Sequence, residues 1–167
     1  GLSNDQIWAI TSDDEGSLWI GTWVGGLNRL RDGKFLTYTT REGLTSDNVR
    51  AICQGRDGSV WIATAGGGLN RLKEGRVTSY READGLPSDH VSALLEDSRG
   101  TLWVGTNLGG AARFAGGRFV PLGPAQGLPH HDVRAFLEDR RGNVWVATIG
   151  GGLTRVSYSP EYRGAAD

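Results

Sequence analysis

Apolar and polar positions repeat along this chain with a period of 42 residues and without an insertion or deletion. Within residues 43–84 the pattern predicts four short β-strands separated by turns that contain glycine: 49–53, 59–64, 69–72 and 76–80. No stretch shows the sustained 3.6-residue period of an amphipathic helix. The repeating unit is therefore predicted to be an antiparallel, four-stranded meander.

Four copies of this unit follow one another in a single register, beginning at Gly1, Gly43, Gly85 and Gly127. The register aligns one tryptophan, one threonine and one arginine in every copy: Trp19, Trp61, Trp103, Trp145; Thr22, Thr64, Thr106, Thr148; Arg29, Arg71, Arg113, Arg155. Because the tryptophans fall in the middle of a predicted strand, we interpret them as core residues. We also expect a structural role for the four arginines.

The second strand of the unit is apolar on both faces, as at Val60, Trp61 and Ile62, so each sheet must be covered on both sides. A repeat of about 40 to 45 residues with four strands and a tryptophan is typical of a β-propeller. Small residues on the first two strands fit wedge-shaped blades: Ala9, Ala51, Ala93, Ala135, Gly21, Ala63, Gly105 and Ala147.

The predicted fold is therefore all-β, a β-propeller fragment of four consecutive four-stranded antiparallel blades. The predicted blades are residues 1–42, 43–84, 85–126 and 127–156, followed by an irregular tail at 157–167. After Val156 the repeat pattern is lost, so the last blade is expected to be incomplete, with its outer strand missing or degenerate.

The segments Gly-Leu-Pro-Ser-Asp-His-Val (85–91) and Leu-Glu-Asp-Ser-Arg-Gly-Thr-Leu-Trp-Val-Gly-Thr (95–106) resemble the two-component regulator propeller repeat. The resemblance covers residues 1 to about 156. It implies the periplasmic or extracellular sensor portion of a bacterial hybrid two-component histidine kinase. Such proteins usually carry enough blades for one or two rings, so we expect this chain to associate with remaining blades, or with itself through blades 1 and 4.

The formal net charge of -1 argues against nucleic acid or an anionic membrane as partner. No apolar run approaches the roughly 18 residues of a membrane-spanning helix, so we expect no direct membrane contact by this segment. Cys53 is the only cysteine, which excludes an internal disulfide. The chain contains no methionine and begins at Gly1, which indicates a mature segment or an excised fragment.

In an up-and-down blade, the second-to-third turns and the blade-to-blade loops emerge on the same face. Two positions on that face vary while the turn glycines stay fixed, as expected where loops carry recognition: Trp8, Arg50, Ser92, Arg134; Trp23, Ala65, Asn107, Ile149. Stacking surfaces, bidentate donors and uncharged hydrogen-bonding groups together suit a carbohydrate. The predicted ligand-binding residues are Trp8, Trp23, Arg50, His90, Asn107, His130, His131 and Arg134.

Each of these features has a structural alternative. Trp8 and Trp23 could reflect irregular packing of a terminal blade, and His90, His130 and His131 could be exposed loop residues rather than a metal or acid–base cluster. The sequence favours a non-enzymatic sensor of a small molecule or oligosaccharide, without catalytic residues, metal or cofactor. The alternatives are a protein–protein interaction scaffold and, less favoured, a propeller lyase or hydrolase.

Overall fold

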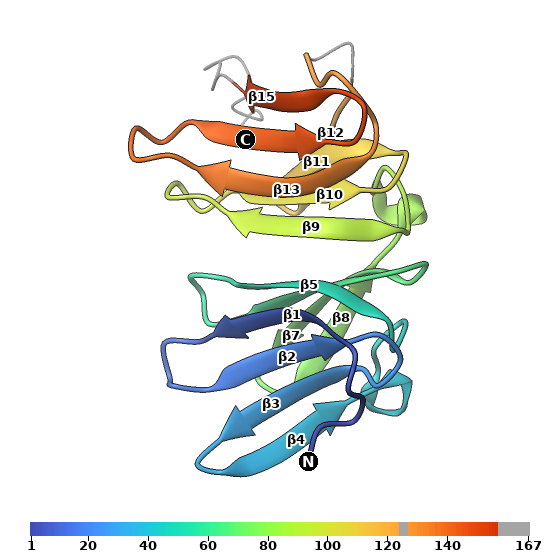
Figure 1. The fold of residues 1–167 in the computed structure, drawn as a ribbon, viewed down its shortest axis with the longest axis vertical. Helices are drawn as coiled ribbons and strands as arrows, with labels where there is room; N and C mark the ends of the chain where they lie inside the picture. Colours follow the sequence, from blue (N-terminus) through green and yellow to red (C-terminus); the bar gives the residue numbers. More distant parts are fainter. Residues whose placement is uncertain (124–126, 157–167) are drawn as a thin grey trace.

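The computed structural model describes residues 1–123 and 127–156, which form four antiparallel sheets; in Figure 1 the first two sheets lie in the lower half of the view and the last two in the upper half. The first sheet contains β1 (Ile7–Ser12), β2 (Leu18–Thr22), β3 (Leu27–Arg31) and β4 (Lys34–Tyr38). The second contains β5 (Val49–Gln54), β6 (Val60–Thr64), β7 (Gly68–Lys73) and β8 (Arg76–Tyr80). The third contains β9 (Val91–Glu96), β10 (Leu102–Thr106), β11 (Gly110–Ala115) and β12 (Arg118–Leu122). The fourth contains β13 (Val133–Glu138), β14 (Val144–Thr148) and β15 (Gly152–Val156).

Every sheet is a simple meander in which strands pair in chain order, and the described strands form no ladder between sheets. Two short 3-10 helices, η1 (Thr40–Glu42) and η2 (Glu82–Asp84), lie in the loops that leave the first and second sheets. The predicted all-β propeller fragment is confirmed, with strands of the second repeat starting and ending within one residue of the prediction. The expected loss of an outer strand concerns residues 157–167, which lie outside the described residues.

Within the part of the chain that the structure describes, the buried apolar side chains form three separate clusters, one between each pair of consecutive sheets. In the middle cluster, Trp61 and Leu69 of the second sheet pack with Val91 and Val104 of the third. The tryptophan of each of the first three sheets is at most 4% exposed, as expected for core residues: Trp19, Trp61 and Trp103. Burial of apolar surface between sheets, rather than within one sheet, therefore holds the blades together.

Three of the four aligned arginines pack against a tryptophan, in keeping with the structural role predicted for the set. The guanidinium carbons of Arg29 and Arg71 each lie 5.1 Å from the ring centroid of their own sheet's tryptophan, and that of Arg113 lies 5.8 Å away. A guanidinium over an indole face is a favourable cation–π arrangement. Each of these three arginines thus packs over the tryptophan of its own blade.

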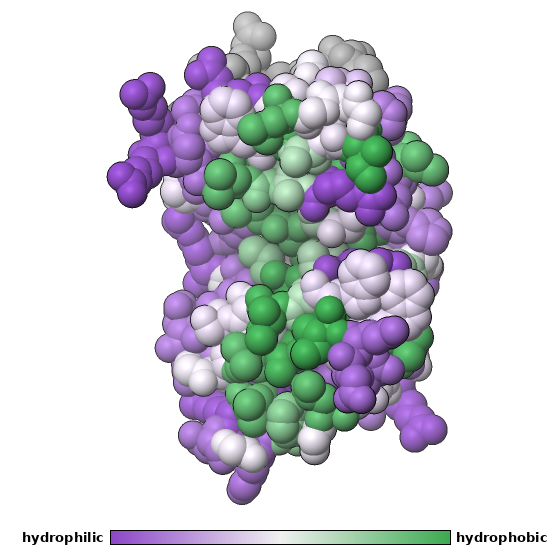
Figure 2. All heavy atoms as spheres, viewed as in Figure 1, coloured by the Kyte–Doolittle hydropathy of each residue, from purple (hydrophilic) through white to green (hydrophobic). Residues whose placement is uncertain are grey.

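The two end sheets leave apolar side chains uncovered. Ile10 on β1 is 62% exposed, whereas Ile52, which has the same place in the second sheet, packs into the first core cluster. Leu153 on β15 is 65% exposed, whereas its counterpart Leu69 is fully buried. Figure 2 shows apolar side chains gathered in the lower half of the molecule, where Figure 1 places β1 and β2. Both ends therefore present the kind of face that packs against another blade elsewhere in the array.

Candidate functional site

The innermost strand of each sheet contains a β-bulge at its second residue. In β1 the pairing moves from Ile7 with Thr22 to Ala9 with Gly21, which leaves Trp8 as the extra residue. The same shift occurs in β5, β9 and β13. A bulged residue has no ladder partner and its side chain is directed differently from those of its neighbours. The four bulge residues are Trp8, Arg50, Ser92 and Arg134.

These four bulge residues line a single cavity of about 260 Å³. The inner strands β1, β5, β9 and β13 pack successively against one another, which brings residues far apart in the sequence together. We call this hollow the inner-strand cavity; its lining residues are Trp8, Arg50, Ala65, His90, Val91, Ser92, Asn107 and Arg134. Every blade thus contributes at least one side chain to the site.

Trp8, which lines the inner-strand cavity, belongs to an aromatic pair whose other member, Trp23, lies outside the lining. The rings of Trp8 and Trp23 stack with centroids 5.3 Å apart and an interplanar angle of 30°. The guanidinium carbon of Arg50 lies 4.1 Å from the Trp8 ring centroid and 4.8 Å from that of Trp23. The two tryptophans remain 49% and 37% exposed, so the pair keeps a surface on which a planar or ring-shaped ligand could stack.

Two guanidinium groups line the inner-strand cavity, and only one of them is ion-paired within the described residues. Arg134 forms an ion pair with Asp132, with 3.0 Å between Nε and Oδ1 and a hydrogen bond of 3.0 Å from Nη2 to Oδ2. Arg50 has no carboxylate partner among the described residues. Burial lowers the pKa of the Arg50 guanidinium, and repulsion by Arg134 lowers it further. Arg50 is therefore the unneutralised cation of the site.

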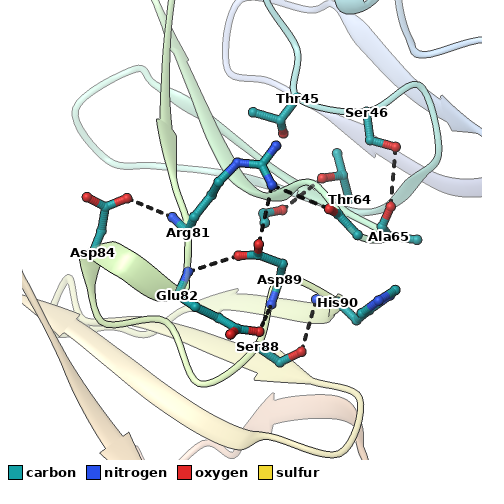
Figure 3. A network of polar contacts seen from close by, with 12 residues as sticks. Thr45, Ser46, Thr64, Ala65, Arg81, Glu82, Asp84, Ser88, Asp89 and His90 are labelled. Carbon is teal, nitrogen blue, oxygen red and sulfur yellow. Dashed lines mark hydrogen bonds and ion pairs between the residues drawn. The ribbon is translucent and has the colours of Figure 1, made fainter.

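A polar network holds the rim of the inner-strand cavity in place (Figure 3). The Asp89 carboxylate accepts a hydrogen bond of 2.9 Å from the Glu82 backbone N–H and is ion-paired with Arg81 at 3.3 Å. The next residue, His90, accepts a hydrogen bond of 2.9 Å at its carbonyl oxygen from the Asn107 backbone N–H. Asp47, the counterpart of Asp89 one repeat earlier, makes the same contact by accepting a hydrogen bond of 2.7 Å from the Thr40 backbone N–H.

His90 and Asn107 face the inner-strand cavity from adjacent loops. A methyl group at Gly66 would lie 3.5 Å from Cε1 of His90, so the imidazole rests against the β6–β7 turn. The amide oxygen Oδ1 of Asn107 is buried and has no hydrogen-bond partner within residues 1–123 and 127–156. An orphaned acceptor of this kind costs roughly 1 to 3 kcal/mol unless a partner satisfies it.

The structure does not bring His130 or His131 to the inner-strand cavity. His130 Nδ1 accepts a hydrogen bond of 3.3 Å from the Asp132 N–H. Asn4, Ser46 and Ser88 make the same contact to the residue two positions on. His130 therefore occupies a turn-stabilising position. The described residues contain no group of three or more histidine, cysteine or acidic side chains arranged to hold a metal.

Ser92 was not among the predicted binding residues, although it shares its place in the register with Trp8, Arg50 and Arg134. That shared place in the register could have identified Ser92 as a residue of the site. Its hydroxyl lies 2.6 Å from the Val133 carbonyl oxygen and 3.2 Å from that of Gly105, so it links the inner strands of the third and fourth sheets. Ser92 therefore fixes the cavity's shape as well as lining it.

A larger hollow of about 470 Å³ lies on the opposite face, between the hairpin tips of the first two sheets. Some of its charged groups pair with one another. Glu15 pairs with Arg29 at 3.2 Å, and Lys73 pairs with Asp57 at 3.0 Å. The groove is a product of blade packing, because a similar hollow recurs between the second and third sheets. We regard the inner-strand cavity as the better candidate site.

The fold and site define an incomplete β-propeller whose inner strands present a different side chain from each blade to one cavity. The chain matches the two component regulator propeller family model at residues 1–24, 43–66, 85–108 and 127–150. It therefore belongs to the two-component regulator propeller family. No curated protein sequence matches it.

Solved structures of similar fold include the extracellular domain of a protein described as a hybrid two-component system, BT3049 from B. thetaiotaomicron. That structure is 26% identical, has a TM-score of 0.82, and is matched over 93% of this chain and 22% of that chain. The extracellular domain of BT4673 from the same organism is 22% identical over 95% of this chain and 24% of that chain, with a TM-score of 0.73. Virginiamycin B lyase from Staphylococcus aureus is 18% identical over 95% of this chain and 58% of that chain, with a TM-score of 0.67.

The chain thus spans about a quarter or less of the two extracellular domains that it resembles. Its likeness to BT4673 and to the lyase concerns the fold alone. None of the helices within the described residues has the length and apolar character needed to cross a membrane.

Proposed function

We propose that this chain is part of the ligand-recognition propeller of a bacterial two-component sensor, located in the periplasm or outside the cell, and that the inner-strand cavity binds the ligand. The observation that carries this proposal is the convergence of Trp8, Arg50, Ser92 and Arg134, from four different blades, on one cavity. Family membership and the likeness to extracellular domains of two-component systems support the sensor role.

The chemistry of the cavity favours a saccharide. The stacked Trp8 and Trp23 rings offer an apolar surface to the face of a sugar ring, while Asn107 and Ser92 offer hydrogen-bonding groups at the side. A volume of about 260 Å³ lies just below the usual range for ligand pockets, roughly 300 to 1,000 Å³. We therefore propose one sugar ring, or the end of an oligosaccharide, as the occupant.

Further blades complete the propeller in this proposal. Ile10 at one end and Leu153 at the other are exposed at positions that are covered between sheets of the array. Contiguous apolar surface of this kind usually marks an interaction site. Additional blades, or the opposite end of a second copy, would bury both faces.

The lyase fold gives an enzymatic alternative only weak support. Among the described residues that line the inner-strand cavity, His90 is the only side chain of a type that commonly serves as a general acid or base. Acid–base catalysis needs a second positioned group, and here the remaining lining residues are arginines, tryptophan, and small polar or apolar residues. Binding without turnover fits this set better.

The test is calorimetric titration of the chain with a panel of neutral and acidic oligosaccharides. A saccharide that binds should lose affinity about tenfold or more in Trp8→Ala and Trp23→Ala, since each substitution removes half of the stacking surface. The matched controls are Arg56→Ala and Arg140→Ala, which alter exposed tips on the opposite face. If binding survives both tryptophan substitutions and is lost in the arginine controls, the ligand binds on the opposite face and the proposed site is wrong.

A further inference from the structure

The inner-strand cavity is cationic although the chain as a whole carries a net charge of -1. Arg50 and Arg134 both line it, and no aspartate or glutamate is among its described lining residues. Asp132 neutralises Arg134 from outside the lining, at 3.0 Å. One positive charge, that of Arg50, is left without a counter-ion in the described part of the chain.

Arg50 is held so that its donors remain available. Its guanidinium lies over the faces of Trp8 and Trp23, at 4.1 and 4.8 Å from their ring centroids. A cation–π contact uses the positive charge of the guanidinium and none of its N–H donors, which lie in the guanidinium plane. No described residue accepts a hydrogen bond from the Arg50 side chain. A planar donor fork of this kind matches the two oxygens of a carboxylate or a sulfate.

Leaving this cation unpaired has an energetic cost that a ligand would remove. Burial and repulsion by Arg134 both lower the pKa of Arg50, so the environment disfavours its charged form. An anion bound to the Arg50 guanidinium inside the cavity would compensate both the burial of that charge and its repulsion by Arg134. The ion pair between Asp132 and Arg134 keeps the second guanidinium in position without cancelling the charge of Arg50.

We propose that the saccharide recognised by this propeller is anionic, carrying a carboxylate or sulfate group that the Arg50 guanidinium binds in bidentate fashion beside the Trp8–Trp23 pair. This inference rests on the proposed function and narrows it from saccharides in general to uronic acids or sulfated sugars. The tryptophans contact the sugar ring, and Arg50 selects its charged substituent.

The experiment compares a trigalacturonate with its methyl ester, which has nearly the same shape but no charge, and with a sulfated galactose trisaccharide. Binding of each to the full chain is measured by calorimetry at low salt. The chain should bind the free acid, the sulfated sugar or both at least about tenfold more tightly than the ester, because charge-assisted hydrogen bonds are about twice as strong as neutral ones. The tighter of the two anions identifies which group the site accepts.

Three variants locate the effect. Arg50→Gln should remove the preference for the anion, so that acid and ester bind with similar affinity, while Arg50→Lys should restore part of that preference by supplying charge without the fork. Arg56→Gln, whose exposed side chain lies on the opposite face, should bind as the parent chain does. Near-ultraviolet circular dichroism of each variant verifies that the fold is intact.

The outcomes separate the two proposals. Equal binding of acid and ester, with both lost in Trp8→Ala, would overturn the anionic inference and leave saccharide recognition standing. An anion preference that persists in Arg50→Gln would overturn the assignment to Arg50. Failure of all the saccharides of the calorimetric panel to bind would overturn the proposed function together with this inference.

Discussion

Replacement of Asp97 by alanine should strongly destabilise the third blade. This side chain is only 1% exposed and stands at the turn between β9 and β10. Its Oδ2 accepts a hydrogen bond of 2.9 Å from the indole N–H of Trp103, and its Oδ1 accepts bonds of 2.9 Å from the backbone N–H groups of Thr101 and Arg99. One carboxylate thus ties the hairpin turn to the core tryptophan.

The expected loss follows from the donors that the change leaves unpaired. The Trp103 indole and the Thr101 N–H are both buried, and each unsatisfied buried donor costs roughly 1 to 3 kcal/mol. Asp97→Ala should therefore lower the free energy of unfolding by about 3 to 5 kcal/mol, a large share of the roughly 5 to 15 kcal/mol typical of a domain. The second blade has Gly55 at this position and uses Asp57 instead, which accepts from the Ser59 hydroxyl at 2.5 Å.

Urea denaturation followed by tryptophan fluorescence measures the loss. Asp5→Ala is the matched control, because Asp5 is exposed and makes no hydrogen bond through its side chain within the described residues. Trp103→Phe removes the indole donor, so in combination with Asp97→Ala it should cost about 1 to 2 kcal/mol less than the sum of the single changes. A loss below about 1 kcal/mol for Asp97→Ala, or full additivity, would refute the view that this carboxylate anchors the tryptophan.

Three further predictions concern blade spacing, pH and association. Gly105→Ala would place a methyl group 2.6 Å from Cγ1 of Val133 and should destabilise the chain by about 1 to 3 kcal/mol in the same urea assay, with partial rescue by Val133→Ala. In the fourth blade, hydrogen bonds from the Asn143 amide and from the Trp145 indole hold the pKa of Asp139 below its usual value. The stability that Asp139 contributes is therefore present above about pH 4 and lost as pH falls below it, so the gap in thermal midpoint between the parent chain and Asp139→Asn should narrow in acid. Ile10→Arg should reduce self-association in sedimentation velocity; an unchanged distribution would exclude this face from the contact.

Much of the fold could be predicted because turn chemistry and strand pattern agree in every repeat. Gly68, for example, has a φ of 79°, a conformation that favours glycine, and it lies in the turn predicted directly before the strand 69–72; β7 begins at this residue. The tryptophan register predicted the core, since a large apolar side chain in mid-strand must be covered on a narrow sheet. The exposed apolar faces of the first and last sheets were also predictable, because the chain has only four blades and the family usually has enough for a complete ring.

The candidate site was predictable in part. Variation between repeats at fixed positions indicated Trp8, Arg50 and Arg134, which do line one cavity. The stacking of Arg50 over two indoles could not be deduced, because it depends on a bulge that changes the direction of the side chain. His130 was included because of its imidazole chemistry, although its counterparts Asn4, Ser46 and Ser88 are all typical turn-stabilising residues.

The bulges explain how one scaffold can carry different recognition chemistries. A residue within the β-ladder is constrained on both faces by neighbouring sheets, and there the four repeats keep similar side chains, such as Val49, Val91 and Val133, all essentially fully buried. The next residue along each strand is the bulge, which has no ladder partner and faces the inner-strand cavity. Substitution there removes no ladder partner, so tryptophan, arginine and serine are all compatible with the same blade. Contacts between sheets are still made from these positions, as by Ser92 to the Val133 carbonyl oxygen and by Arg50 to Trp8. The conserved core packing and the variable cavity lining thus lie at adjacent residues of each inner strand, which lets the ligand preference differ from blade to blade on one scaffold.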